Sequence, residues 1–463
     1  MNLHGIKMHI GNIPVLDPGF IPFTSYITAY EESTRKNGGR PLAIALERDN
    51  GQISVYKTHI HGTPEFENSD RLYIERMVKT MLWMKGGYRI FICGDAGMAR
   101  YISQTYSPCG ARAFDAGFMA RVYEHPLEGT YLPYEETPTE KESGLMVGGN
   151  LKGCRIGFDA GGSDRKVSAV IDGQAVFSEE VVWHPKMNSD PRYHYEGILS
   201  AFRTAASQMP RVDAIGVSSA GIYVDNRCMV ASLFIKVPRE RFNREVKDIY
   251  LRAAKEIGNV PVAVCNDGDV AALAGAMELG DNNVLGMAMG TSEAAGYIGP
   301  DGCIRGWLNE LAFTPIDLNT NGALDEWSGD RGCGVKYFSQ DAVIKLASAA
   351  GIELLSEESP GEKLKAVQKL MEQGDDRAKA VYDSLGVYLG HGLALYSKLY
   401  NMKHVLLLGR VMSGEGGNIL YNTAVNVLRD EYPEHAAKLK LHLPDEKSRR
   451  VGQSVAAAGL PVL

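Results

Sequence analysis

The feature that most constrains this fold is a strand, a glycine turn and a second strand between residues 154 and 171. Apolar residues dominate the first strand, which ends at Asp159, and a Gly161-Gly162-Ser163 turn follows before a second apolar run. Glycine lets backbone N–H groups approach an anion closely, and a carboxylate at a strand end can orient the water shell of magnesium. The segment favours a phosphate-binding hairpin; the alternative is an ordinary hairpin with a polar turn.

Size and composition indicate a globular protein of two or three domains. The chain has 463 residues, of which 44% are hydrophobic and 23% charged. No apolar run reaches the roughly 18 residues that span a bilayer, and the N-terminal residues lack the apolar core of a secretory signal, so we expect a cytoplasmic protein with no membrane partner. The formal net charge of -7 argues against a nucleic-acid partner.

The seven cysteines are scattered and show no paired metal-ligand spacing, so we interpret them as reduced thiols. Before residue 150 we expect an irregular stretch to about residue 40, a hairpin over 42–56, a helix over 71–85 and a polar linker over 127–150. From residue 151 onward strands and helices alternate, which favours an α/β fold. Phe114-Asp115-Ala116-Gly117 repeats the later Phe158–Gly161 sequence, and we interpret this repeat as coincidence.

Five segments in a fixed order resemble the ROK family (repressors, open reading frames and sugar kinases) of the actin-like ATPase and sugar kinase superfamily. They lie at residues 159–163, 215–221, 266–273, 289–292 and 405–410. The resemblance implies two RNase H-like lobes with an interlobe cleft, at about 149–280 and 281–463. The last helix lies in the second lobe or returns to the first. Residues 1–148 would then be an N-terminal α/β extension of unknown role.

The resemblance also implies ATP-dependent phosphoryl transfer to a sugar hydroxyl, with Asp267 as the general base. Asp159 would hold magnesium through water, and Asp159 and Asp267 are expected on opposite sides of the cleft. An isolated Asn266-Asp267 pair before a helix would instead be interpreted as a helix cap. The remaining implied contacts are Gly161, Gly162, Ser163, Gly290, Thr291, Ser292 and Gly409 for the nucleotide, and Ser219, Gly221, Asn266 and Glu310 for the sugar.

The sequence departs from the family pattern around its zinc motif. Phe313 replaces the zinc-binding histidine and only Cys333 matches a ligand cysteine, so we predict no structural zinc. Phe313 should turn inward, with Trp307 and Trp327 as candidate neighbours. In the family the same histidine often contacts the sugar, and so does a glutamate that falls here at about Val335. Either the substrate differs or other residues compensate, and Arg331 and Lys336 could serve an acidic or phosphorylated sugar.

Two further departures lie near the expected cleft. Glu293 adds bulk and charge beside the second phosphate loop unless it points away. The insert at 183–195 is rich in polar aromatic residues; it either lines the cleft mouth or is a solvated loop.

Two readings of the function follow from the resemblance, and a third has no support. The first is a sugar kinase using ATP and Mg²⁺, and the second is a catalytically altered sugar- or nucleotide-binding regulatory protein of the same fold. A hydrolase or transferase would need a nucleophile motif, which we do not find. A homodimer is a further expectation from the family.

Overall fold

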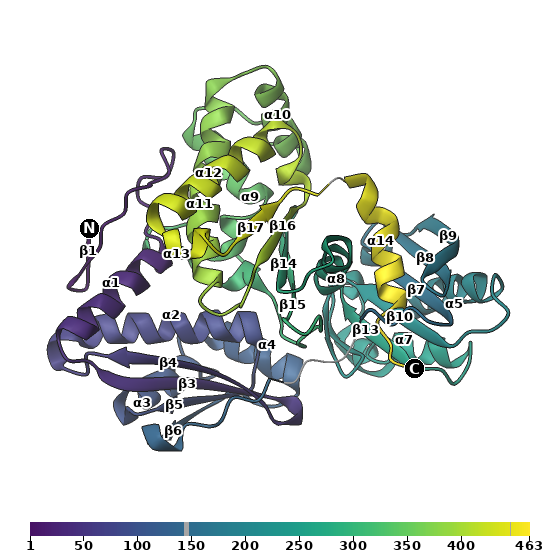
Figure 1. The fold of residues 1–463 in the computed structure, drawn as a ribbon, viewed down its shortest axis with the longest axis horizontal. Helices are drawn as coiled ribbons and strands as arrows, with labels where there is room; N and C mark the ends of the chain where they lie inside the picture. The colour runs from purple at the N-terminus through teal and green to yellow at the C-terminus, as the bar shows by residue number, and fades with distance from the viewer. Residues whose placement is uncertain (143–147, 445) are drawn as a thin grey trace.

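The computed structural model describes residues 1–142, 148–444 and 446–463, with backbone only for 446–451. Figure 1 shows an N-terminal domain, a central helical and sheet region, and a third region at the opposite end from the N-terminal domain. Residues 143–147 of the predicted linker lie outside the described residues. Among the described helices, none is long and apolar enough to cross a membrane.

The N-terminal domain is a four-stranded sheet with helices packed on it. Its strand order is β4 (Gln52–Ile60), β3 (Arg40–Arg48), β5 (Arg89–Cys93) and β6 (Glu128–Leu132), with only β5 and β6 parallel. Its helices are α1 (Phe23–Lys36), α2 (Glu67–Lys85), α3 (Ala96–Thr105) and α4 (Ala113–Tyr123). A short β1 (Asn2–Leu3) and β2 (Ile6–Lys7) pair precedes them.

Two sequence expectations for this domain are wrong. α1 lies within the stretch expected to be irregular, because its buried face carries Phe23, Tyr26, Ile27 and Tyr30 at helical spacing among polar residues. β6 lies within the expected linker and pairs with β5. The repeated Phe-Asp-Ala-Gly sequence is coincidental, since its first copy lies in helix α4 and its second in strand β7.

The first lobe is built on a five-stranded sheet. The order is β13 (Val262–Asn266), β10 (Ala214–Ser219), β7 (Cys154–Ala160), β8 (Asp164–Ile171) and β9 (Gln174–Val182). β13, β10 and β7 are parallel, so their carboxyl ends meet at one edge of the sheet. β8 runs antiparallel to both of its neighbours, β7 and β9. The other elements are α5 (Pro191–Ala206), β11 (Ile222–Val224), β12 (Arg227–Val230), α6 (Arg239–Arg241), α7 (Ile249–Lys255) and α8 (Asp267–Leu279).

The second lobe has a four-stranded sheet covered by long helices. Its order is β15 (Glu293–Ile298), β14 (Val284–Met289), β16 (His404–Leu408) and β17 (Lys440–His442). Its helices are α9 (Gln340–Ala349), α10 (Pro360–Glu372), α11 (Asp376–Tyr396), α12 (Glu415–Glu431) and α13 (Pro433–Ala436). We did not expect α12 or β17 from the sequence.

The last helix, α14 (Glu446–Ala458), packs on the first lobe against β7, β8, β10 and α8. This contact is close: a Cβ on Gly157 would lie 1.9 Å from the Ser454 carbonyl oxygen. The Ser168 and Ser454 hydroxyls lie 2.8 Å apart. Figure 1 shows α14 beside β7, far along the chain from the strands it covers.

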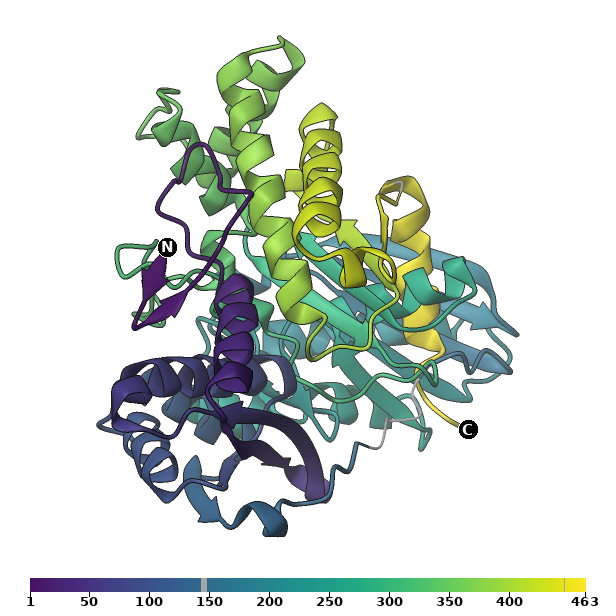
Figure 2. The ribbon, with the colours of Figure 1, turned by 60° about the vertical axis from the view of Figure 1, so that its left-hand side comes forward.

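The N-terminal domain also packs closely on the second lobe. Figure 2 shows α1 running beside α11, and the Thr24 hydroxyl donates to the His391 carbonyl oxygen at 2.8 Å. Fifteen of the nineteen α2 residues are buried, because α2 has the sheet on one side and the second lobe on the other. One continuous hydrophobic cluster therefore includes residues of both units.

Candidate functional site

Asp159 lies at the carboxyl end of β7, where the parallel strand β10 brings Ser218 beside it. The Ser218 hydroxyl donates a hydrogen bond to Asp159 Oδ1 at 2.7 Å. Burial raises the pKa of Asp159 to about 6, and the nearby negative charge of Asp267 adds to the rise while the Ser218 hydrogen bond opposes it. The two carboxyl groups are thus close enough to influence each other.

Asp267 is the first residue of α8 and follows β13 directly. Burial raises the pKa of its carboxyl group, and this rise is partly offset by the hydrogen bond from the Gly268 N–H and, to a smaller extent, by the positive charge of Lys186. Because β13 and β7 belong to one sheet, both carboxyl groups come from the first lobe. The expectation that Asp159 and Asp267 face each other across the cleft is therefore wrong: they converge along one sheet edge.

Asn266 caps α8, as the alternative interpretation of the Asn-Asp pair describes. Its side-chain oxygen accepts from the Gly268 N–H at 2.7 Å, and its amide donates to the Gly221 carbonyl oxygen at 2.7 Å. Ser219 is fully buried, and its hydroxyl lies 2.8 Å from the Tyr250 hydroxyl. Ser219 therefore belongs to the lobe core rather than to an open ligand surface.

The Gly161-Gly162-Ser163 turn joins β7 to β8 and is pinned by the insert that follows β9. The Trp183 indole N–H donates to the Gly161 carbonyl oxygen at 2.8 Å, and its backbone N–H to that of Ser163 at 3.1 Å. Lys186 follows in the same insert: a Cβ placed on Gly162 would lie 3.4 Å from Lys186 Nζ. Lys186 is exposed, so its ammonium group is open to a ligand above the turn.

Lys186 is the functional candidate that sequence reasoning missed as an individual residue. The polar aromatic insert at 183–195 was the only signal, and it did not identify which side chain would face the turn. In the structure Lys186 is near both the Gly162 turn and Asp267.

The second glycine turn, Gly290-Thr291-Ser292, joins β14 to β15. The Thr291 hydroxyl accepts a hydrogen bond from Arg410 at 3.0 Å, and a Cβ on Gly409 would lie 2.3 Å from the Met289 carbonyl oxygen. The turn and Gly409 therefore adjoin at one end of the second-lobe sheet, as the resemblance implies for nucleotide contacts.

Glu293 points away from this turn. Its side chain is buried and accepts a hydrogen bond from the Tyr396 hydroxyl at 3.1 Å. Burial raises the pKa of Glu293 to about 8, so it is largely protonated at neutral pH. It adds no charge to the phosphate loop.

Glu310 is held by the N-terminal domain. Its backbone N–H donates to the Trp83 carbonyl oxygen at 3.0 Å, and the Asn309 N–H donates to that of Met84 at 3.1 Å. Burial, together with smaller contributions from the charges of Asp267 and Asp269, raises the pKa of Glu310 to about 7. Glu310 thus lies near the α8 carboxyl groups.

Phe313 turns inward, as expected, but its main partner lies in the N-terminal domain. Its ring centroid is 4.2 Å from that of Trp83 and 5.4 Å from that of Trp327. Trp307 instead stacks on Tyr297, so the expectation for Trp307 is wrong.

The cationic residues considered for an acidic sugar are engaged elsewhere. Lys336 Nζ lies 2.7 Å from Glu326 and 2.9 Å from Asp341, and Arg331 donates to the Gly322 carbonyl oxygen at 2.8 Å. These pairings remove the specific support for an acidic or phosphorylated sugar.

The described residues contain no group of three or more His, Cys, Asp or Glu side chains arranged to hold a metal ion. Cys333 is buried and unpaired with other cysteines, and the prediction of no structural zinc stays a prediction.

Comparison with known proteins decides the family. The ROK family model matches residues 155–458, which is more than half of the chain. The chain belongs to the ROK family. A search of curated protein sequences finds no significant match.

Two solved ROK structures show the same fold. The ROK hexokinase from Thermus thermophilus is 21% identical, with a TM-score of 0.50, over 65% of this chain and 97% of the hexokinase. A ROK family transcriptional regulator, described as a homologue of the E. coli MLC protein, is 19% identical, with a TM-score of 0.51, over 73% of this chain and 82% of the regulator. The expected α/β fold, with actin-like ATPase lobes, is confirmed.

Proposed function

We propose that this protein is an ATP-dependent kinase that phosphorylates a hydroxyl group of a sugar or sugar derivative. The observation that carries the proposal is that Asp159 and Asp267 lie at the carboxyl ends of β7 and β13, at one edge of the first-lobe sheet, with Lys186 beside the Gly162 turn that follows β7. A glycine turn, a carboxylate base and a cation in one place match what phosphoryl transfer requires: positioning, charge neutralisation and a proton acceptor.

In the proposed reaction, the sugar hydroxyl oxygen attacks the γ-phosphorus of ATP and its proton passes to the Asp267 carboxylate. A new O–P bond forms as the bond between the γ-phosphorus and the β–γ bridging oxygen breaks, and ADP leaves. The raised pKa of Asp267 makes it a better proton acceptor than a solvent-exposed aspartate. Activity should therefore rise with pH as Asp267 loses its proton.

The flanking turns would hold the nucleotide. Gly161, Gly162 and Ser163 offer backbone N–H groups from the first lobe, and Gly290 and Thr291 with Gly409 do so from the second. Lys186 would neutralise phosphate charge, and magnesium, when bound with ATP, would supply further neutralisation. Because the two turns belong to different lobes, nucleotide binding would favour lobe closure.

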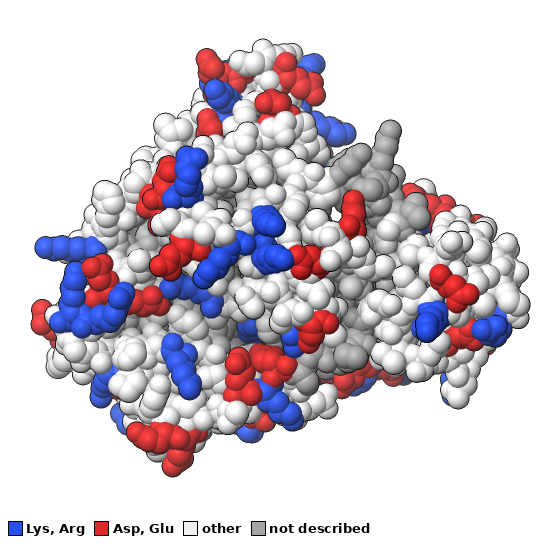
Figure 3. Space-filling model, in the orientation of Figure 1, with Lys and Arg blue, Asp and Glu red and all other residues white. Residues whose placement is uncertain are grey.

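The second candidate is a sugar- or nucleotide-binding regulatory protein. This candidate is favoured by the hydrogen bonds that the side chains of Asn266 and Ser219 make within the first lobe. Because of these bonds, the two side chains are less able to bind a sugar as the resemblance implies. On the face shown in Figure 3, acidic and basic residues are interspersed, so this face offers no continuous basic surface for nucleic acid. We propose small-molecule partners; a homodimer and a cytoplasmic location remain predictions.

The deciding experiment mixes purified protein with ATP, Mg²⁺ and a sugar panel and measures ADP. Sugar-dependent ADP release that is lost in Asp267→Asn supports the kinase. Sugar-induced thermal stabilisation without ADP release in the wild-type protein supports the regulatory protein.

A further inference from the structure

A large cavity lies where the N-terminal domain meets both lobes. Its volume is about 610 Å³, within the range of small-molecule sites, which occur preferentially at domain interfaces. One wall is the end of α4 in the N-terminal domain, a second is the segment from β12 to α6 in the first lobe, and a third is Trp327 of the second lobe. A ligand that fills the cavity would therefore contact all three units.

The Trp327 wall is held in place by ion pairs. Asp330, three residues later, lies 3.0 Å from both Arg76 and Lys79 and 2.8 Å from Arg112, all of the N-terminal domain. The Trp327 side chain nevertheless remains 63% exposed where it lines the cavity. The loop is thus fixed while an aromatic surface stays open to a ligand.

The cavity adjoins the implied sugar contacts on both lobes. A Cβ placed on Gly221 would lie 2.6 Å from the Cβ of Ala231, which lines the cavity. On the second lobe, the Trp327 ring packs on Phe313 at 5.4 Å between centroids, three residues after Glu310. An exposed indole ring at this place suits the apolar face of a sugar ring.

Two arginines at the cavity lack an anionic partner. Arg121 comes from α4 and Arg239 from α6, and both line the cavity. Among the residues that the structure describes, neither guanidinium group makes a hydrogen bond or an ion pair. Burial lowers the pKa of Arg121, and the positive charge of Arg239 lowers it further, so the two like charges repel each other. A phosphate or carboxylate between them would relieve this repulsion and accept paired N–H bonds.

The rest of the lining does not neutralise these arginines. Glu124 is the single carboxylate among the described residues of the lining, and it is shared by Lys247 and, at 3.2 Å, by Arg227. The cavity therefore keeps a positive balance of charge.

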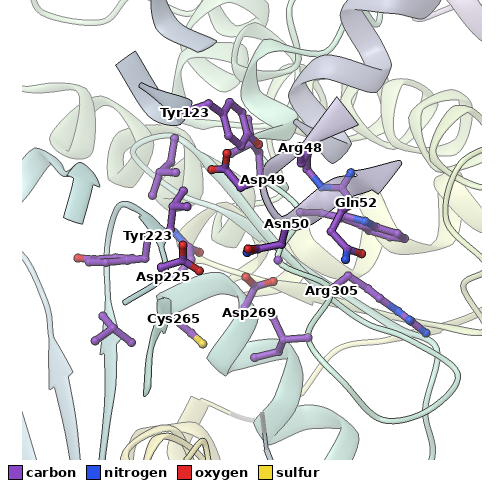
Figure 4. Close-up of a pocket in the computed structure, with 18 of the residues that line it drawn as sticks. Arg48, Asp49, Asn50, Gln52, Tyr123, Tyr223, Asp225, Cys265, Asp269 and Arg305 are labelled. Atoms are coloured by element: carbon purple, nitrogen blue, oxygen red, sulfur yellow. The ribbon is translucent and has the colours of Figure 1, made fainter. Parts of the chain in front are cut away.

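A second, smaller cavity between the same units differs in this respect. Figure 4 shows it, and its volume is about 210 Å³. Both of its arginines are paired: Arg48 lies 2.6 Å from Glu142, and Arg305 lies 3.0 Å from Asp301. The larger cavity is therefore the better place for an anion.

We infer that the 610 Å³ cavity binds an anionic sugar, either a sugar phosphate or a sugar acid, with Arg121 and Arg239 on the anionic group and Trp327 against the sugar ring. Arg331 and Lys336 are engaged elsewhere, and Arg121 and Arg239 take the role that the sequence suggested for them. The N-terminal domain thereby selects the substrate through Arg121. The inference rests on the proposed function only for the fate of the sugar.

Binding can be measured without ATP. Isothermal titration at neutral pH and low salt would compare glucose, mannose and galactose with their 6-phosphates, with their uronic acids and with inorganic phosphate. We expect at least one anionic sugar to bind about tenfold more tightly than its parent hexose and more tightly than inorganic phosphate. A preference for 6-phosphates or for uronic acids identifies the anionic group. The inference is overturned if every anionic sugar binds no better than its parent, or no better than inorganic phosphate.

Two variants with a matched control test the arginines. Arg121→Gln and Arg239→Gln change exposed side chains, and each should weaken binding of the anionic sugar about tenfold without changing that of the parent hexose. Arg100→Gln alters an exposed arginine of α3 outside the cavity and should have no effect. Unchanged affinity in both cavity variants, or an equal loss in the control, would reject the assignment.

Trp327 reports directly on occupancy. Trp83 and Trp183 are buried and Trp307 is half-buried, so Trp327 is the tryptophan most open to quenching by acrylamide. The bound anionic sugar should reduce this quenching in the wild type, and Trp327→Phe should abolish the effect. A ligand effect that persists in Trp327→Phe would place the ligand elsewhere and overturn the inference.

The same proteins separate this inference from the kinase proposal. Anionic-sugar binding that depends on Arg121 and Arg239, without ADP formation, would uphold the cavity and reject the kinase. ADP formation with a neutral sugar, at a KM that Arg121→Gln and Arg239→Gln leave unchanged, would do the reverse.

Discussion

The backbone N–H of Glu310 donates a 3.0 Å hydrogen bond to the carbonyl oxygen of Trp83, at the C-terminal end of α2. This bond joins a residue of the implied sugar site to the N-terminal domain. The Phe313 ring, three residues later, packs on the Trp83 ring. The N-terminal domain is therefore part of the structure that positions Glu310.

Replacing Phe313 by alanine tests this packing. The ring is 4% exposed and contacts Trp83 and Trp327, so its loss should lower the free energy of unfolding by about 3–5 kcal/mol. Urea denaturation measures the change. Phe177→Ala, which removes a half-buried phenylalanine of β9 in the first lobe, should cost less; an equal cost would contradict a special role for this contact.

Lys186→Met tests the cation above the Gly162 turn. If Lys186 neutralises phosphate, the variant should raise the KM for ATP or lower kcat, with a combined loss of about tenfold or more in kcat/KM. Lys379→Met, an exposed lysine on α11, is the matched control. Steady-state kinetics with ATP varied at saturating sugar gives the result, and equal constants for the two variants would reject this role.

Gly409→Ala tests the second-lobe nucleotide contact. Gly409 and Gly414 both have positive φ, 94° and 73°, but only at Gly409 would a Cβ meet backbone, at 2.3 Å from the Met289 carbonyl oxygen. Gly414→Ala should therefore cost only about 1–2 kcal/mol of stability from backbone strain. Gly409→Ala should cost more and weaken ATP binding measured by titration; equal effects on ATP affinity would argue against a nucleotide contact here.

Glu293→Gln tests the buried carboxyl group of β15. Its folded-state pKa of about 8 exceeds its ordinary value of 4.5, so the folded protein holds one extra proton between these pH values. Stability from this group therefore falls as pH rises through that window. The glutamine variant should be more stable than wild type at pH 8 by about 1–3 kcal/mol, with little difference near pH 4. Thermal unfolding across pH measures this, and a pH-independent difference would contradict it.

The sequence predicted the fold best in segments where the order of apolar residues and glycines favours the same structure as the packing of the segment in the folded protein. The glycine turns after β7 and β14 lie between strands, as their flanking apolar runs indicated. α1 was missed because its buried face is interrupted by polar residues that the rest of the protein covers. α12 was missed because it begins directly after Gly414 and has two more glycines in its first turn, and glycine is more typical of turns than of helices.

The site was predicted only as far as the family motifs extend. Asp159 and Asp267 were identified from their strand ends, and they do lie near each other. The sequence placed both residues in the first lobe, but their position along one sheet edge depends on strand order, which the motifs do not specify. Lys186 reaches the Gly162 turn through an insert, and no local pattern assigns such a long-range contact.

The central claim is that Asp267 accepts the proton of a sugar hydroxyl during transfer from ATP. The most direct measurement is sugar-dependent ADP formation by wild-type protein and by Asp267→Asn, with a thermal unfolding curve to confirm that the variant is folded. The account predicts turnover by the wild type and a fall in kcat of about 10²–10⁴-fold in the folded variant. Equal turnover by the two proteins, or no sugar-dependent ADP formation by the wild type, would contradict it.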